Sequence, residues 1–241
     1  MNAFNRRDLA ILPIAGDTCI VIACDSCGSI GMKNGDAYKL PPRYAAKFTA
    51  RVALTEVLCS GAKPVAISNG VSNEMHPTGE ETILSIREEL KNADITDIAI
   101  IGSTEENFTT SMTALAITAI GVAKENELKF ERAAKGDKLV LFGLPHVGSE
   151  VNLESAGLYS EIRRLLQMQG VKEIVPVGSK GIAYEAETLA ALNGIEFKSY
   201  DTGVDYYKSA GPATCILILC TDASIDKILR IHEVSAVIDE F

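Results

Sequence analysis

The stretch Thr18–Gly31, "TCIVIACDSCGSIG", joins an apolar run to an acidic residue and a glycine-rich segment. The run predicts a β-strand, and Asp25 stands at its end, where a side chain can enter a site without breaking a core. Gly28 and Gly31 permit close backbone approach and expose N–H groups, which suits a phosphate. Lys33 follows in the same loop and could reach a phosphate as a point charge. The glycine spacing matches no Walker or dinucleotide fingerprint, so a flexible loop is the alternative.

The same stretch carries Cys24 and Cys27 at the C-x-x-C spacing of zinc and redox sites. Most of the other cysteines lie in apolar runs, where cysteine behaves as a small hydrophobic residue. The three histidines are far apart and form no H-x3-H pair. Because a zinc site needs further ligands at fixed spacing, we interpret both cysteines as packing residues.

Composition limits the class of protein. The 241 residues are 47 % apolar, and the net charge of −9 argues against a nucleic-acid partner, since phosphates require a basic excess. No signal peptide is visible and the apolar runs are too short to cross a membrane, so we expect a cytoplasmic protein without a membrane partner. The charged segment 123–136, "AKENELKFERAAKG", predicts a linker between domains 1–122 and 137–241.

Two further carboxylates stand at positions that favour a site. Asp8 enters the first predicted strand after two arginines, with a solvated charge as the alternative. Glu56 extends the apolar stripe of a helix predicted from Pro42 to Ser60. A carboxylate in such a stripe is costly unless it is paired or binds a cation. The alternative is that the helix turns Glu56 to the edge of the stripe.

A polar insert interrupts two predicted strands in residues 101–121, "IGSTEENFTTSMTALAITAIG". It is longer than the two to five residues of a plain hairpin. Hydroxyl, carboxylate and amide oxygens are ligands that magnesium and its phosphates accept. The insert therefore predicts a functional loop, whose polar residues are Ser103, Thr104, Glu105, Glu106 and Asn107.

Two motifs mark helix starts. Thr78 with Glu81 three residues later predicts a capping box for a second helix. In the second half, Ser179 and Lys180 lie between glycines at a strand-to-helix junction, where N–H groups and a lysine make an anion site. A structural turn is the alternative there.

Five segments, in order, resemble the aminoimidazole-ribonucleotide-synthetase-like superfamily, which includes thiamine-monophosphate kinase and selenophosphate synthetase. They are "RDLAIL", "IACDS", "ARVALTEVLCSGAKPVAIS", "IGSTEENF…ITAIG" and "GDKLVLFG". The pieces "ACDSCGSIG", "KFTARVAL" and "GSTEENF" resemble the α-ribazole kinase branch most.

The resemblance implies an α+β fold of two domains. The N-terminal α/β domain would dimerise into a β-barrel that binds ATP, and the C-terminal domain would be ferredoxin-like α+β. It implies Asp8, Asp25, Glu56 and Glu105 as Mg²⁺ ligands, with Lys33 offsetting charge. Nucleotide-binding positions would be Gly28, Gly31, Gly102, Ser103, Thr104 and Asn107, and Ser179 and Lys180 would face the acceptor.

The implied activity is transfer of a phosphoryl group from ATP to a hydroxyl of α-ribazole, a nucleoside used to build cobalamin. Two departures weaken the match: an expected carboxylate beside Asp8 is missing, and the aspartate of the Gly-Gly-Asp-Thr loop is Ser103. Glu105 or Glu106 would replace it. Two other hypotheses therefore stand, an ATP-dependent synthetase acting on a formyl or selenide substrate, and a nucleotide-binding protein without catalysis.

Overall fold

The computed structural model describes residues 2–199, 201–231 and 235–241, and its chain divides into two compact units. Unit 1 comprises Met1–Val57 and Ala62–Asn126, and unit 2 comprises Leu58–Gly61 and Glu127–Phe241. The domain limits 1–122 and 137–241 stay a prediction. The mixed α+β class expected from the sequence is confirmed by the helices and sheets of both units.

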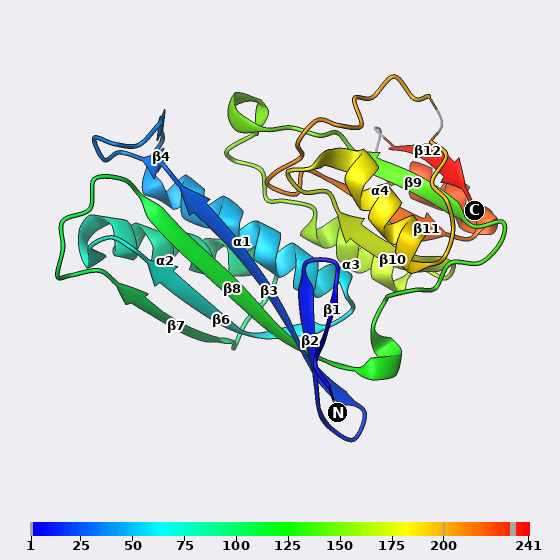
Figure 1. Ribbon diagram of the computed structural model, residues 1–241, viewed down its shortest axis with the longest axis horizontal. Helices are drawn as coiled ribbons and strands as arrows, with labels where there is room; N and C mark the ends of the chain where they lie inside the picture. The colour runs from blue at the N-terminus through cyan, green and yellow to red at the C-terminus, as the bar shows by residue number, and fades with distance from the viewer. Residues whose placement is uncertain (1, 200, 232–234) are drawn as a thin grey trace. The chain divides into compact units, whose positions relative to one another are not determined.

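Unit 1 is built on a six-stranded sheet in the order β1-β2-β3-β8-β6-β7 (Figure 1). Neighbouring strands are antiparallel except β6 and β7, which are parallel. Two-residue strands β4 (Ile30–Gly31) and β5 (Tyr38–Lys39) pair separately. The sheet strands are β1 (Phe4–Arg6), β2 (Leu9–Ala15), β3 (Thr18–Gly28), β6 (Lys63–Val71), β7 (Ala99–Thr104) and β8 (Ala114–Lys124).

One face of this sheet is buried and the other is not. Alternate residues such as Val21 and Ile117 are fully buried, whereas Ile20, Ile22 and Ile120 between them are only half-buried. This period of two is the pattern of a sheet with one covered face. Helices α1 (Pro42–Cys59) and α2 (Glu80–Asn92) both lie on the same face of the sheet in Figure 1.

A buried ion pair joins the two helices. The Arg51 guanidinium donates to both carboxylate oxygens of Glu89, at 3.1 and 2.8 Å, and Asn92 donates to the same carboxylate at 3.1 Å. The Glu89 side chain is 0 % exposed and that of Arg51 is 4 % exposed. A bidentate pair with further hydrogen bonds is the arrangement that offsets the cost of desolvating two charges.

The start of α2 differs from the sequence prediction. A π-helical turn, η1 (Met75–Gly79), precedes α2, and its Thr78 hydroxyl donates to Glu74 Oε1 at 2.7 Å. Gly79 is the N-cap and no side chain caps the helix. The predicted capping box is wrong because Thr78 lies in the preceding turn, where the Glu74 carboxylate takes its hydroxyl.

Unit 2 has a four-stranded antiparallel sheet in the order β10-β11-β9-β12. Its side chains are buried on both faces, so β11 is a continuous apolar run, "CILILC". The order corresponds to that of a ferredoxin-like sheet with α4 added. The elements are β9 (Lys138–Gly143), α3 (Tyr159–Gln167), β10 (Val171–Pro176), α4 (Gly181–Leu192), β11 (Cys215–Cys220), α5 (Ile225–Leu229), β12 (Ser235–Glu240) and the 3₁₀ turns Gly148–Glu150 and Asp222–Ser224. A further 3₁₀ turn, Glu125–Glu127, spans the boundary between the two units in the sequence.

Among the described residues, no helix has the length and apolar character needed to cross a lipid bilayer.

Glu89→Ala tests the ion pair between the helices. Removing one partner leaves the Arg51 charge buried, so we expect the free energy of unfolding to fall by about 3–5 kcal/mol. Urea denaturation followed by circular dichroism measures it. Glu88→Ala, at the exposed neighbouring position, is the control and should change stability by less than about 0.5 kcal/mol. Equal stability of the two variants would contradict the prediction.

Candidate functional site

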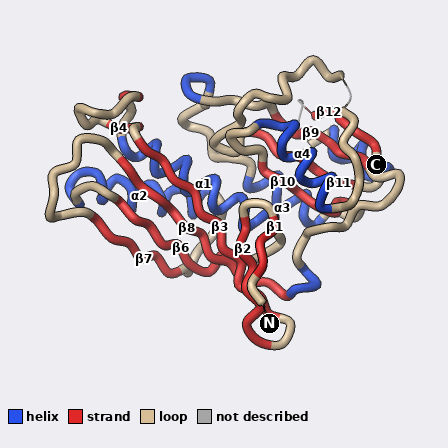
Figure 2. Tube along the Cα trace, viewed as in Figure 1, coloured by secondary structure: helices blue, strands red, loops and turns tan. Residues whose placement is uncertain are grey.

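The ends of four strands form an open groove in unit 1. Strands β3, β6 and β7 end and β8 begins at the same end of the sheet, where Figure 2 shows loops gathering. The groove has a volume of about 610 Å³. It is lined by Ser26, Cys27, Gly28, Gly70, Val71, Ser72, Ser103, Thr104, Glu105, Ala114, Leu115 and Ala116.

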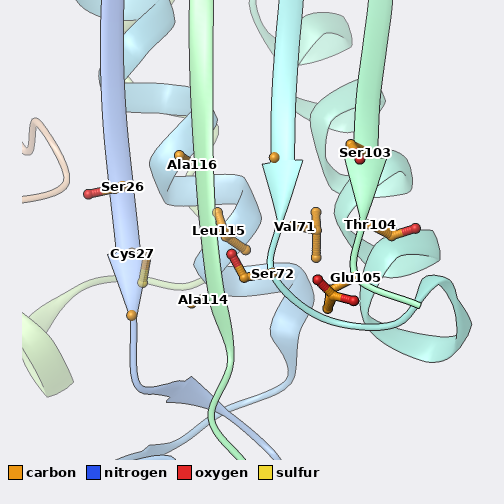
Figure 3. Close-up of a pocket in the computed structure, with 12 residues that line it drawn as sticks. Ser26, Cys27, Val71, Ser72, Ser103, Thr104, Glu105, Ala114, Leu115 and Ala116 are labelled. Atoms are coloured by element: carbon orange, nitrogen blue, oxygen red, sulfur yellow. The ribbon is translucent and has the colours of Figure 1, made fainter. Parts of the chain in front are cut away.

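Four of the residues expected from the sequence line this groove: Gly28, Ser103, Thr104 and Glu105. Figure 3 shows Glu105 just beyond the end of β7, with Ser72 beyond the end of β6. The sequence analysis did not single out Ser72, which directly follows the end of β6 at Val71. The sequence does contain a sign of this position: the polar residues Ser72, Asn73 and Glu74 follow β6, just as polar residues follow β7.

The nine residues 105–113 connect β7 to β8, which are not neighbours, because β6 lies between them. The connection must therefore pass the end of β6, and this accounts for a length greater than a hairpin needs. The comparison with a plain hairpin was wrong for that reason. The loop nevertheless forms part of the groove wall through Glu105.

Both carboxylates of this loop accept hydrogen bonds within unit 1. Glu105 Oε1 accepts from the backbone N–H groups of Asn107 at 2.7 Å and Phe108 at 3.2 Å. Glu106 Oε1 accepts from the Met75 N–H and the Thr104 hydroxyl, both at 2.8 Å. The two residues are thus not equivalent: Glu105 reaches the groove, whereas Glu106 ties the loop to η1.

Asp25 is a largely buried carboxyl that also feels the charge of Asp8. Asp25 continues the buried alternation of Val21 and Ala23, so it lies on the helix-covered face of β3. Burial, with a smaller effect of the Asp8 charge, raises the pKa of Asp25 to about 6, although the Ser26 N–H opposes the shift. Neither carboxyl lines the groove, but Cys27, two residues after Asp25, does.

Glu56 is engaged by an arginine. Its Oε2 lies 3.8 Å from Arg7 Nη1, and the side chains are 10 % and 2 % exposed. The sequence left open whether Glu56 is paired, binds a cation or lies at the edge of the apolar stripe. In the structure Glu56 forms an ion pair with Arg7. Arg7 therefore links the first strands to α1, and Glu56 is not gathered with Glu105.

Lys33 lies in a second polar cluster. Its Nζ is 2.6 Å from Glu74 Oε2, and Thr78 donates to the other oxygen of the same carboxylate. Burial of Glu74 works against its charge, but these two donors outweigh it and hold its pKa below the ordinary value. Lys33, which was expected to contact a phosphate, thus forms an ion pair with Glu74 in this structure.

Two of the expected nucleotide-binding glycines have a packing role. A Cβ on Gly31 would lie 2.0 Å from the Thr113 hydroxyl, and one on Gly102 would lie 2.4 Å from the Asn69 amide oxygen. Both sites demand glycine for steric reasons. A Cβ on Gly28 would meet nothing within 4 Å, so this groove position has room for a ligand.

Cys24 and Cys27 have no common site. They lie three residues apart on an extended strand, so they point to opposite faces at a separation of about 10 Å. A disulfide needs Cα atoms within about 7 Å. Both thiols are free, and burial followed by the Asp25 charge raises the pKa of Cys27.

In unit 2, Ser179 and Lys180 precede α4. Lys180 Nζ stacks 4.0 Å from the centroid of the Tyr184 ring, a cation–π contact. Gly181 has φ +83°, and a Cβ there would lie 2.7 Å from the Tyr206 carbonyl oxygen. The junction is a tight structural turn that presents an exposed serine and lysine.

Part of the chain matches a known family model. Residues 6–123 match AIR synthase related protein, N-terminal domain. This segment contains all the groove-lining residues and both Asp8 and Asp25. No curated protein matches the chain.

Solved structures share the fold over most of the chain. Phosphoribosylformylglycinamidine synthase II from Thermotoga maritima aligns with a TM-score of 0.70 at 13 % identity, covering 95 % of this chain and 41 % of that protein. HypE of the HypE–HypF complex aligns with a TM-score of 0.68 at 17 % identity, covering 92 % and 83 %. T. maritima PurL complexed with ATP gives 0.68 at 14 % identity, over 95 % and 41 %. The chain thus spans less than half of the PurL chains, and the likeness is one of fold.

The carboxylates of unit 1 fit magnesium only in part. The described residues contain no group of three or more His, Cys, Asp or Glu side chains that could hold a metal. Mg²⁺, however, commonly uses one or two carboxylates plus phosphate oxygens and water. The Asp8 charge acts on the Asp25 carboxyl, which burial already makes costly to ionise, and a cation would relieve that cost. Glu56 lies 3.8 Å from Arg7, and its role as a metal ligand stays a prediction.

Asp25→Asn tests the burial of this carboxyl through pH. A raised pKa in the folded state means that the contribution of Asp25 to stability is complete below about pH 3.8 and is lost as the pH rises through about 6. Without Mg²⁺, the variant should melt at a higher temperature than the wild type at pH 8, and the difference should vanish near pH 4. Thermal denaturation across this range measures it. Asp17→Asn, in the exposed turn before β3, is the control; a pH-independent difference for Asp25→Asn would refute the assignment.

Proposed function

We propose that this protein is an ATP- and Mg²⁺-dependent kinase of a small-molecule alcohol, with α-ribazole as the acceptor. The observation that carries the proposal is the groove at the strand ends, lined by hydroxyls and small residues within a segment that matches an AIR synthase related domain. Small side chains let phosphate oxygens approach backbone N–H groups closely. A structure of the same fold, T. maritima PurL, is complexed with ATP.

In this proposal the phosphates of ATP occupy the groove beside Gly28, Ser103 and Thr104. Asp8 and Asp25 hold Mg²⁺, which supplies positive charge against the phosphates. Glu105 is the only carboxylate among the groove-lining residues, and it is proposed to contact the metal's water shell. Asn107 and Lys33 belong to the flanking loops, and Lys33 would exchange Glu74 for phosphate.

Phosphoryl transfer needs positioning and electrostatic compensation more than a strong base. The chain provides both through fixed strand ends and a lysine beside the groove loops. Ser179 and Lys180 of unit 2 are proposed to bind the acceptor, since an exposed hydroxyl and ammonium suit a polyhydroxylated nucleoside.

A second candidate is an ATP-dependent synthetase. Its support is the fold likeness to phosphoribosylformylglycinamidine synthase II, which covers 95 % of this chain. It differs in the acceptor: ATP turnover would depend on a formyl or selenide substrate and not on α-ribazole.

We also propose a homodimer that closes the open sheet face into a β-barrel. The uncovered face of β3 and β8 carries half-buried Ile20, Ile22, Ile120 and Val122, and Ile101 of β7 is 70 % exposed. A contiguous apolar face of this kind indicates a protein interface rather than a solvated surface. A second copy offers the same face, as a two-fold interface requires.

The kinase proposal is tested by incubating the protein with Mg-ATP and α-ribazole and measuring α-ribazole phosphate by mass spectrometry. Asp25→Asn should lower turnover at least a hundredfold, because the metal loses a charged ligand, while Asp17→Asn keeps wild-type turnover. ATP turnover that requires a formyl or selenide substrate would favour the synthetase instead. Wild-type turnover in Asp25→Asn would refute the proposed metal site.

The dimer proposal is tested with Ile22→Glu, which places a charge in the apolar sheet face. We expect sedimentation to change from a dimer to a monomer, since an unpaired buried charge opposes association. Leu84→Glu, at an exposed position of α2, is the control and should leave the dimer intact. A monomeric wild type would contradict the proposal.

A further inference from the structure

Asn73, directly after β6, is fully buried and makes hydrogen bonds in three directions. Its Nδ2 donates to the Thr110 hydroxyl at 2.5 Å and to the Met112 carbonyl oxygen at 2.8 Å. Its Oδ1 accepts from the Ala114 N–H at 2.9 Å. Its carbonyl oxygen accepts from the Glu105 N–H, also at 2.9 Å. One residue therefore holds both ends of the loop 105–113.

The residues that Asn73 fixes are parts of the groove. Glu105 and Ala114 line the groove, and so does Ser72, the residue before Asn73. Ser72 itself donates its N–H to the Ala114 carbonyl oxygen at 2.9 Å. Asn73 is not among the lining residues, so its effect on a ligand is indirect, through the backbone positions of its neighbours.

A second buried side chain, that of Asp36, fixes the end of the same loop at Thr113. Asp36, 5 % exposed, accepts from the Thr113 N–H at 2.7 Å, the Thr113 hydroxyl at 2.8 Å and the Lys33 N–H at 2.8 Å. Burial disfavours its charge, yet these donors prevail and keep the pKa of Asp36 below its ordinary value. The loop that carries Lys33 is thus joined to the end of loop 105–113.

We infer that Asn73 is a positioning residue for nucleotide binding: it holds the groove wall in the ligand-binding arrangement before the ligand arrives. The inference rests on the proposed ATP site. Ordering nine loop residues at the moment of binding would cost free energy, and a pre-formed wall avoids that cost. The donor end of the amide is essential, because Met112 presents a carbonyl oxygen that would repel a carboxylate in place of the amide.

Asn73→Asp is the test, with Asn69→Asp as the matched control. Asn69 is a buried amide in the same strand region, and its Nδ2 donates to the Ile101 carbonyl oxygen at 3.1 Å, away from the loop. Each variant loses a buried amide donor, so both should melt at lower temperatures. Only Asn73→Asp should weaken Mg-AMPPCP binding, by at least tenfold in calorimetry at a temperature where both variants are folded. Hydrogen exchange without nucleotide should show faster exchange of the Glu105 and Ala114 amides in Asn73→Asp alone.

The outcomes separate the inference from the proposed function. If the wild type binds Mg-AMPPCP and Asn73→Asp binds it within twofold of the wild type, Asn73 has a structural role only and the inference is overturned. If both variants lose affinity equally, general destabilisation explains the loss and the inference again fails. If the wild type binds no nucleotide, the proposed function is refuted, and the inference with it. Should Asn73→Asp not fold, Thr110→Val removes one partner of the amide and should weaken binding by several-fold.

Discussion

The antiparallel pairing of β3 with β8 is the constraint on which unit 1 depends. It runs over eleven residues without a register shift, from Thr18 opposite Lys124 to Gly28 opposite Ala114. Because side chains alternate, a slip of one residue would move the whole apolar set to the uncovered face. The same register brings Gly28 and Ala114 together at the end of the sheet, where both line the groove. The groove is therefore a product of sheet register, and its shape does not require a loop to fold independently.

The strands themselves could be predicted from the sequence because they depend on local pattern. The apolar runs indicated β3 and β8, but β3 continues past Asp25 to Gly28. Ser103 and Thr104 belong to β7 and Glu105 follows it; all three line the groove, and their role in binding a ligand stays a prediction. What could not be predicted was the order of the strands in the sheet. The sequence contains no local sign that β6 lies between β7 and β8, so the length of the connecting loop was interpreted without its main cause.

The carboxylates show a second limit of sequence reasoning. Glu56 and Glu89 are both buried carboxylates on helices, and each is paired with an arginine distant in the sequence. Such ion pairs depend on tertiary contacts, so the local sequence pattern does not indicate them. Asp25 differs physically, since burial and a second carboxyl raise its pKa and give a cation something to neutralise. A perturbed carboxyl is a more specific sign of a functional position than a carboxylate at a favourable place in the sequence.

Buried polar residues connect the fold to the groove. Asp36 and Asn73 would each be expensive to bury alone, but their hydrogen bonds, several of them to loop backbone, offset the desolvation cost. Gly31 is part of the same arrangement, because only a residue without Cβ leaves room for the Asp36–Thr113 bonds. Gly31, which was expected to contact phosphate, thus contributes indirectly, because it leaves room for these loop hydrogen bonds. Three loops that are separate in the sequence are held as one polar assembly, and the rigidity of the candidate site depends on buried hydrogen bonds as much as on the strands.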